Sequence, residues 1–102
     1  MQLAQSEPAL ADLEQAVAIA PNYAWANMSY GLVLYELVPE QRADAVASIQ
    51  QAFALEPENR DLWHGLLRMI GRLEATELRE MYCAQIPSGI ELDLEIQKAA
   101  CQ

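Results

Sequence analysis

Apolar residues recur three and four positions apart along most of this chain, in blocks that end at prolines. The first block places Leu10, Leu13 and Val17 at this spacing and closes at Pro21. Such spacing puts side chains on one face of an α-helix, and no segment shows the two-residue alternation of a half-buried strand. The pattern therefore predicts an all-α protein.

The same pattern predicts about six helices joined by connections of two to four residues. Ser6 is the expected N-cap of the first helix, and Pro8 is tolerated in its first turn. That helix should end near residue 20, and the others should span about 23–37, 40–55, 59–72, 75–85 and 90–100. Because short connections reverse the chain, neighbouring helices are expected to form antiparallel hairpins.

One thirteen-residue segment occurs twice, 36 positions apart. Residues 9–21 read ALADLEQAVAIAP, and residues 45–57 read AVASIQQAFALEP. Six positions are identical, and four more exchange one apolar residue for another. A period of this length indicates stacked supersecondary units, so it predicts a repeat architecture. A repeat scaffold indicates how a protein binds and leaves the identity of its partner open.

Both copies resemble the second helix of a tetratricopeptide repeat (TPR). In that family a small residue is followed by a large one four positions on, a second small one three further on, and a closing proline. The small residues allow close helix packing, and the proline ends the helix so that the chain can reverse. The matching residues are Ala9, Leu13, Ala16 and Pro21 in the first copy, and Ala45, Ile49, Ala52 and Pro57 in the second.

Other positions follow the family pattern or depart from it. Gly31 stands where the family carries a small residue for close helix approach, and Trp63 and Leu66 match its Trp-x-x-Leu. Asn27 stands where the family prefers Trp, and Leu67 where it prefers a small residue. Asn27 falls in the helix expected between the duplicated segments, and Leu67 in the helix expected after the second one.

The resemblance covers about residues 9–72, and residues 73–102 are interpreted as a degenerate repeat with capping helices. Together they are predicted to form one domain, residues 1–102, built as a TPR-like stack of antiparallel helix hairpins. In this family the first helix of each repeat lines a concave groove that takes a partner peptide or helix. The resemblance therefore implies a protein-binding module.

The helix expected at 23–37 is apolar on two faces, which is more than a simple surface helix requires. One stripe, Tyr30, Gly31 and Leu34, would pack inward. The other predicts an exposed apolar groove for a partner segment. The alternatives are that the terminal helices, or a further N-terminal helix of the repeat, cover this second stripe, or that it forms a homodimer surface. Its residues are Trp25, Met28, Leu32 and Tyr35, spaced at i, i+3, i+7 and i+10.

The helix expected at 59–72 carries a polar stripe instead. Five of the six basic residues of the chain lie at or after Arg60, which predicts a site for the carboxylates of a partner. The alternative is a solvated face with Glu74 and Glu77 as counter-charges. The stripe runs through Asp61, His64, Arg68 and Arg72, and the last three are the candidate partner contacts.

The charge balance disfavours two classes of partner. The formal net charge is −9 and only six residues are basic, so neither nucleic acid nor an anionic membrane surface is an expected partner. The longest apolar run, residues 31–35, is far too short to cross a bilayer, so no membrane insertion is expected. No secretory signal is visible, and Cys83 and Cys101 do not make a disulfide framework. We therefore expect reduced thiols and a cytoplasmic location.

No arrangement of residues indicates catalysis. His64 is the only histidine and has no metal-ligand spacing around it, so neither a metal nor a cofactor is expected. The chain lacks a nucleophile turn and a glycine-rich phosphate loop, and Cys83 is expected to be a buried, inert thiol. The sequence predicts a non-catalytic adaptor or scaffold. The alternatives are an accessory TPR-like arm of a larger enzyme, such as a transferase, and a self-associating structural domain.

Overall fold

A computed structural model describes the backbone of residues 2–101 and the side chains of residues 9–101. This part of the chain contains six α-helices, two short 3-10 turns and no strand, which confirms the all-α prediction. The chain divides after Glu56 into two compact units, and each is described by itself. The single domain predicted for residues 1–102 and the TPR resemblance both stay predictions.

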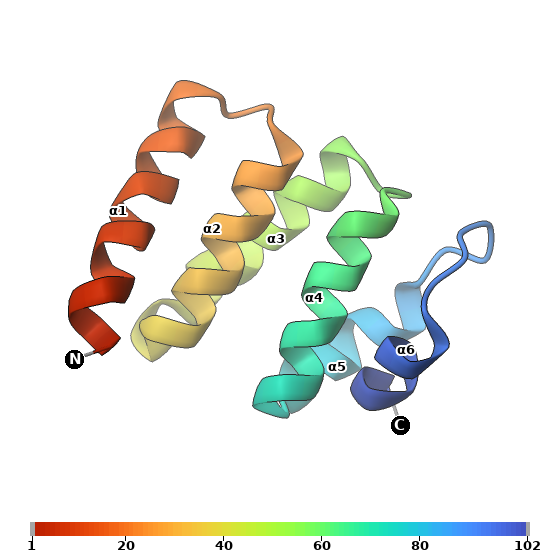
Figure 1. The fold of residues 1–102 in the computed structure, drawn as a ribbon. Helices are drawn as coiled ribbons and strands as arrows, with labels where there is room; N and C mark the ends of the chain where they lie inside the picture. The colour runs from red at the N-terminus through yellow and green to blue at the C-terminus, as the bar shows by residue number, and fades with distance from the viewer. Residues whose placement is uncertain (1, 102) are drawn as a thin grey trace. The chain divides into compact units, whose positions relative to one another are not determined.

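The first unit contains three helices and one 3-10 turn: α1 (Gln2–Ile19), α2 (Ala24–Leu37), η1 (Pro39–Gln41) and α3 (Arg42–Leu55). Figure 1 shows α1 and α3 each lying beside α2, and successive helices run in opposite directions. The predicted bounds of α2 and α3 are confirmed to within two residues. The predicted start of the first helix is wrong, because α1 begins at Gln2 and Ser6 lies inside it; the side chains of Ser6 and Pro8 lie outside the described residues.

The second unit contains α4 (Arg60–Leu73), α5 (Thr76–Tyr82), η2 (Cys83–Gln85) and α6 (Leu94–Cys101). The helix predicted at 75–85 exists, but its last turn is 3-10. The last helix begins four residues later than predicted. Asp93 is the reason, because its carboxylate accepts hydrogen bonds from the backbone N–H groups of Glu95 (2.9 Å) and Ile96 (3.1 Å) and thereby caps the helix.

Gly31 sets the closest approach between α2 and α3. A Cβ atom built on it would lie 2.8 Å from the carbonyl oxygen of Ala45 and 2.8 Å from Cγ1 of Ile49. Both neighbours belong to the second duplicated segment, and Ala45, Ile49 and Ala52 are all completely buried. The small-residue positions of this copy therefore permit the helices to pack closely, as the sequence predicted.

The prolines that close the two duplicated segments receive equivalent hydrogen bonds. In the first unit, the side-chain amide of Asn27 donates to the carbonyl oxygen of Pro21 at 3.0 Å. In the second unit, the indole Nε1–H of Trp63 donates to the carbonyl oxygen of Pro57 at 2.9 Å. Asn27 and Trp63 are themselves 36 positions apart. The apparent departure at Asn27 therefore preserves the contact that Trp63 makes, with a different donor.

Replacing Gly31 with alanine tests the close approach. In an open helix this change stabilises by up to about 1 kcal/mol through helix propensity. Here the new methyl group meets a backbone oxygen, so α2 and α3 must separate, and we expect the free energy of unfolding to fall by about 1–3 kcal/mol. Urea unfolding followed by circular dichroism measures it. Gly89→Ala is the control because nothing lies within 4 Å of its added Cβ; an equal loss in both variants would contradict the packing argument.

Asn27→Leu tests the hydrogen bond to Pro21. Asn27 is only 4% exposed, so the variant leaves a carbonyl oxygen without its donor in a buried setting. We expect a loss of about 1–3 kcal/mol in the free energy of unfolding. Gln50→Leu removes an amide from an exposed position of α3 and should change stability by no more than about 0.5 kcal/mol. A stability of Asn27→Leu equal to that of the control would show that the bond contributes nothing.

Candidate functional site

The apolar stripe predicted on α2 is not a continuous exposed surface. Met28 is completely buried, and Tyr35 is 4% exposed. Tyr35 is covered by Arg42, whose guanidinium lies 4.4 Å from the centre of the tyrosine ring and whose Nε donates to the Tyr35 carbonyl oxygen at 3.1 Å. Leu32 is half-buried, and only Trp25 is exposed. For Met28 and Tyr35 the prediction of an exposed groove is therefore wrong, because both side chains are buried and α3 supplies the residue that covers Tyr35.

Trp25 belongs to a different exposed group, at the connection between α1 and α2. Ile19 at the end of α1 is 76% exposed, Tyr23 is 56% exposed, and Trp25 is 44% exposed. The backbone N–H of Tyr23 donates to the carbonyl oxygen of Ala20 at 3.0 Å, and this turn brings the two helix ends together. Helical periodicity did not predict this cluster, because two of its three members lie at a helix end and in a turn.

The polar stripe on α4 also separates into residues with different roles. His64 is half-buried, and its Nε2 accepts a hydrogen bond from the backbone N–H of Asp93 at 3.0 Å. His64 therefore supports the N-terminus of α6. Arg68 and Arg72 remain exposed.

Arg68 and Arg72 line a pocket between α4 and α6, with a volume of about 260 Å³. Gly71 contributes to its floor, where α4 and α6 approach so closely that a Cβ on Gly71 would lie 3.4 Å from the Ala99 carbonyl. The sequence predicted the arginines but not the second wall, because α6 lies more than twenty residues further along the chain. The lining residues are Leu67, Arg68, Gly71 and Arg72 from α4, and Glu95, Ile96 and Ala99 from α6.

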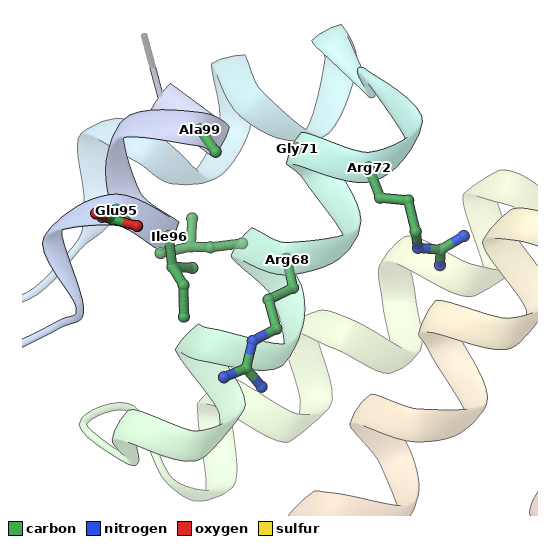
Figure 2. Close-up of a pocket in the computed structure, with 7 residues that line it drawn as sticks. Arg68, Gly71, Arg72, Glu95, Ile96 and Ala99 are labelled. Atoms are coloured by element: carbon green, nitrogen blue, oxygen red, sulfur yellow. The ribbon is translucent and has the colours of Figure 1, made fainter.

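The charges of this pocket are divided between its two walls. Figure 2 shows Arg68 and Arg72 projecting from α4 with guanidinium groups that point in different directions, so they do not form a two-pronged clamp. Glu95 and Ile96 come from the opposite wall, α6. Between them the exposed apolar surface comes from Ile96 and Ala99, whereas Leu67, which also lines the pocket, is completely buried. The pocket therefore offers an apolar centre with a positive α4 side and a negative α6 side.

The C-terminal end of α6 is fastened to α5 and η2. The Nε of Arg79 donates to the carbonyl oxygen of Ala100 at 2.8 Å, which places a cation where a helix C-terminus favours one. Cys83 and Cys101 form a disulfide, with their Cα atoms 5.8 Å apart. The expectation of two reduced thiols, and of an inert thiol at Cys83, is therefore wrong. Spacing along the chain could not show this pairing, because the two cysteines are 18 residues apart and meet only through the fold.

Two tyrosines have raised pKa values. Burial of the Tyr82 phenol raises its pKa above the ordinary value, and its ring packs edge-on against Trp63 with centroids 6.2 Å apart. Tyr30 has a raised pKa first because of burial, and then because the carboxylates of Glu14 and Asp44 disfavour the phenolate. Both phenols therefore stay protonated in the folded protein at a pH that ionises an ordinary tyrosine.

Within the described residues 2–101, whose side chains are described from residue 9 onward, we find no group of three or more histidine, cysteine and acidic side chains placed to hold a metal ion. In the same part of the chain, no helix combines the length and the apolar character needed to span a bilayer. Comparison of the chain with protein-family models, curated proteins and solved structures finds no match. The pocket between α4 and α6 is therefore the candidate site on its geometry alone.

The raised tyrosine pKa values predict loss of stability in alkali. An unfolded tyrosine loses its proton near pH 10, whereas Tyr82 in the folded protein does so at higher pH. Unfolding therefore releases protons above about pH 10, and the free energy of unfolding falls as pH rises through this range. Tyr82→Phe should show a shallower fall, measured by urea midpoints between pH 9 and 11 with phenolate absorbance as the titration check. Identical pH profiles for the variant and the parent would contradict the assignment.

Proposed function

We propose that this protein is a non-catalytic interaction module of the TPR type, and that the pocket between α4 and α6 receives a segment of a partner protein. The proposal rests on one observation above all: Arg68 and Arg72, two of the three polar-stripe residues expected to contact a partner, both line a pocket whose other wall comes from α6 and is partly apolar. Positive charge is scarce in a chain with a net charge of −9, so its placement beside an apolar hollow favours recognition over solubility.

The size of the pocket supports an anchoring side chain as its occupant. Sites for drug-sized ligands and cofactors usually enclose about 300–1,000 Å³. This pocket, at about 260 Å³ and open to solvent, is smaller and suits one large apolar side chain. A partner residue of the leucine or phenylalanine type would pack against Ile96 and Ala99.

The division of charge in the pocket sets the chemistry of the flanking residues. An acidic residue beside the anchor would meet Arg68, and a basic residue on the other side would meet Glu95. A partner with the opposite order would place like charges together on both walls. We therefore expect an acid–apolar–base segment to bind, and its charge-reversed form to be excluded.

The other sequence-based alternatives stay predictions. An accessory arm of a larger enzyme would use the same pocket, and a self-associating domain would use an apolar surface such as the one at Trp25. The cytoplasmic location also stays a proposal, and the disulfide bears on it. Disulfides persist in oxidising compartments, whereas those of the cytoplasm are usually transient and redox-active.

Short synthetic peptides test this function directly. The set has a central leucine or phenylalanine with glutamates on one side and lysines on the other, with reversed order and alanine at the anchor as comparisons. We expect the first form alone to bind, measured by fluorescence anisotropy, and to shift the NMR signals of α4 and α6. Arg68→Glu should weaken binding by roughly tenfold or more, because it replaces attraction with repulsion.

Arg60→Glu is the matched control for Arg68→Glu. It makes the same charge reversal on the same helix, at an exposed residue outside the pocket. It should leave binding within about threefold of the parent, since exposed charges further away are screened by salt. Equal binding of all peptides, or equal weakening by both variants, would rule out the pocket as the binding site.

A further inference from the structure

We propose that the Cys83–Cys101 disulfide is a thiol-exchange site, attacked at Cys101 by a low-molecular-weight thiol, and that its opening releases α6 and dismantles the pocket. The exchange site stands on its own geometry. Its consequence for partner binding rests on the function proposed above.

A second hollow gives a thiol access to Cys101. It has a volume of about 270 Å³ and is lined by Leu94, Gln97, Lys98 and Cys101, all from α6. Cys101 is only partly covered, and Leu94 is 69% exposed, so the hollow opens to solvent. Lys98 supplies the one cation of this lining, and a cation favours the approach of an attacking thiolate. Access and charge together favour attack at the Cys101 sulfur.

Cys83 is placed to act as the leaving group. Its sulfur lies 4.0 Å from the carbonyl oxygen of Ala100, and the Nε of Arg79 donates to that same oxygen at 2.8 Å. The guanidinium of Arg79 and the Cys83 sulfur therefore have the Ala100 carbonyl oxygen as a common neighbour. A nearby positive charge stabilises a departing thiolate, and a more stable leaving thiolate departs faster.

The exchange proceeds in two balanced steps. The thiolate of the reductant attacks the Cys101 sulfur, so a bond forms between these two sulfurs, the Cys83–Cys101 bond breaks, and Cys83 leaves as a thiolate that then takes a proton. A second reductant thiol attacks the mixed disulfide and frees Cys101, which takes the second proton. The protein gains two electrons and two protons, and two reductant thiols become one disulfide.

Opening this bond removes the covalent cross-link between a short helix, α6, and the segment that carries Cys83. α6 has eight residues, and isolated helices of that length are marginal in water. Its remaining attachments are its packing against α4, the hydrogen bond from Asp93 to His64, and the hydrogen bond from Arg79 to Ala100. The disulfide constrains the detached state, so its loss increases the population in which α6 is open.

The pocket depends on α6 for three of its seven lining residues: Glu95, Ile96 and Ala99. When α6 detaches, the negative wall and much of the apolar centre leave with it. Partner binding should therefore be strong in the oxidised protein and weak in the reduced protein.

Hydrogen exchange tests the release of α6 on the full chain, with glutathione as the reductant. We expect the amides of α6 to exchange roughly tenfold to a hundredfold faster after reduction, while those of α2 and α3 serve as the internal reference. Cys83→Ser with Cys101→Ser should reproduce the reduced state without any reductant. Unchanged hydrogen-exchange rates in α6 after reduction would contradict the proposal that the disulfide holds α6 in place.

Mapping of the first adduct tests the site of attack, and it uses the folded, oxidised protein. Brief exposure to glutathione, acid quenching and peptide mass spectrometry should place the mixed disulfide on Cys101. Lys98→Glu should slow its formation by roughly threefold or more, whereas Arg60→Glu, an equal charge change at a residue that does not line this hollow, should slow it less. An adduct on Cys83, or equal rates in both variants, would overturn the assignment of the exchange site.

Peptide binding before and after reduction separates this proposal from the proposed function. Faster exchange in α6 together with at least tenfold weaker binding of the acid–apolar–base peptide supports both. Faster exchange without peptide binding in either state supports the release of α6 on reduction and rejects only the proposed peptide-binding function. Equal peptide affinity in both states, despite a released α6, rejects redox control of the pocket.

Discussion

The carbonyl oxygen of the proline that closes each duplicated segment needs a donor, and both units supply one from the sixth residue after it. Asn27 does so for Pro21 and Trp63 for Pro57. Each proline follows the C-terminus of a helix, where backbone carbonyl oxygens no longer have an N–H donor from the next helical turn. A buried carbonyl left there without a donor would cost the free energy of a lost hydrogen bond. The bond ties the first turn of the next helix to that point. The direction in which α2 and α4 leave their turns therefore depends on it.

The direction of α2 and of α4 in turn allows each helix to pack closely against another helix at a glycine. Gly31 lets α2 reach the backbone of α3, and Gly71 lets α4 reach the backbone of α6. In the second unit this approach has a chemical result, since it forms a pocket with charges of opposite sign on its two walls. His64, Arg79 and the disulfide then hold α6 in place from its two ends. The scaffold and the candidate site are therefore parts of one packing arrangement.

Most of the fold could be predicted from the sequence. The helices at α2, α3 and α4 lie within two residues of the predicted bounds, because apolar spacing and prolines act locally. The inward stripe of α2 was also correct at Gly31 and Leu34. The candidate site could be predicted less well from the sequence than the helices could. Spacing placed Met28 and Tyr35 on one face of a helix, but it could not show that Arg42 covers the tyrosine.

Apolar spacing, the prolines and the duplicated segment together determined, from the sequence alone, that this chain is helical, where the helices end, and which small residues allow them to approach. These features depend on neighbours within about one repeat, so periodicity carries them. Only the tertiary structure decided that α4 packs against α6, that Cys83 meets Cys101, and that His64 supports a helix end instead of facing a partner. Each of these contacts joins residues 18 or more positions apart, and no local pattern records which distant segments will meet.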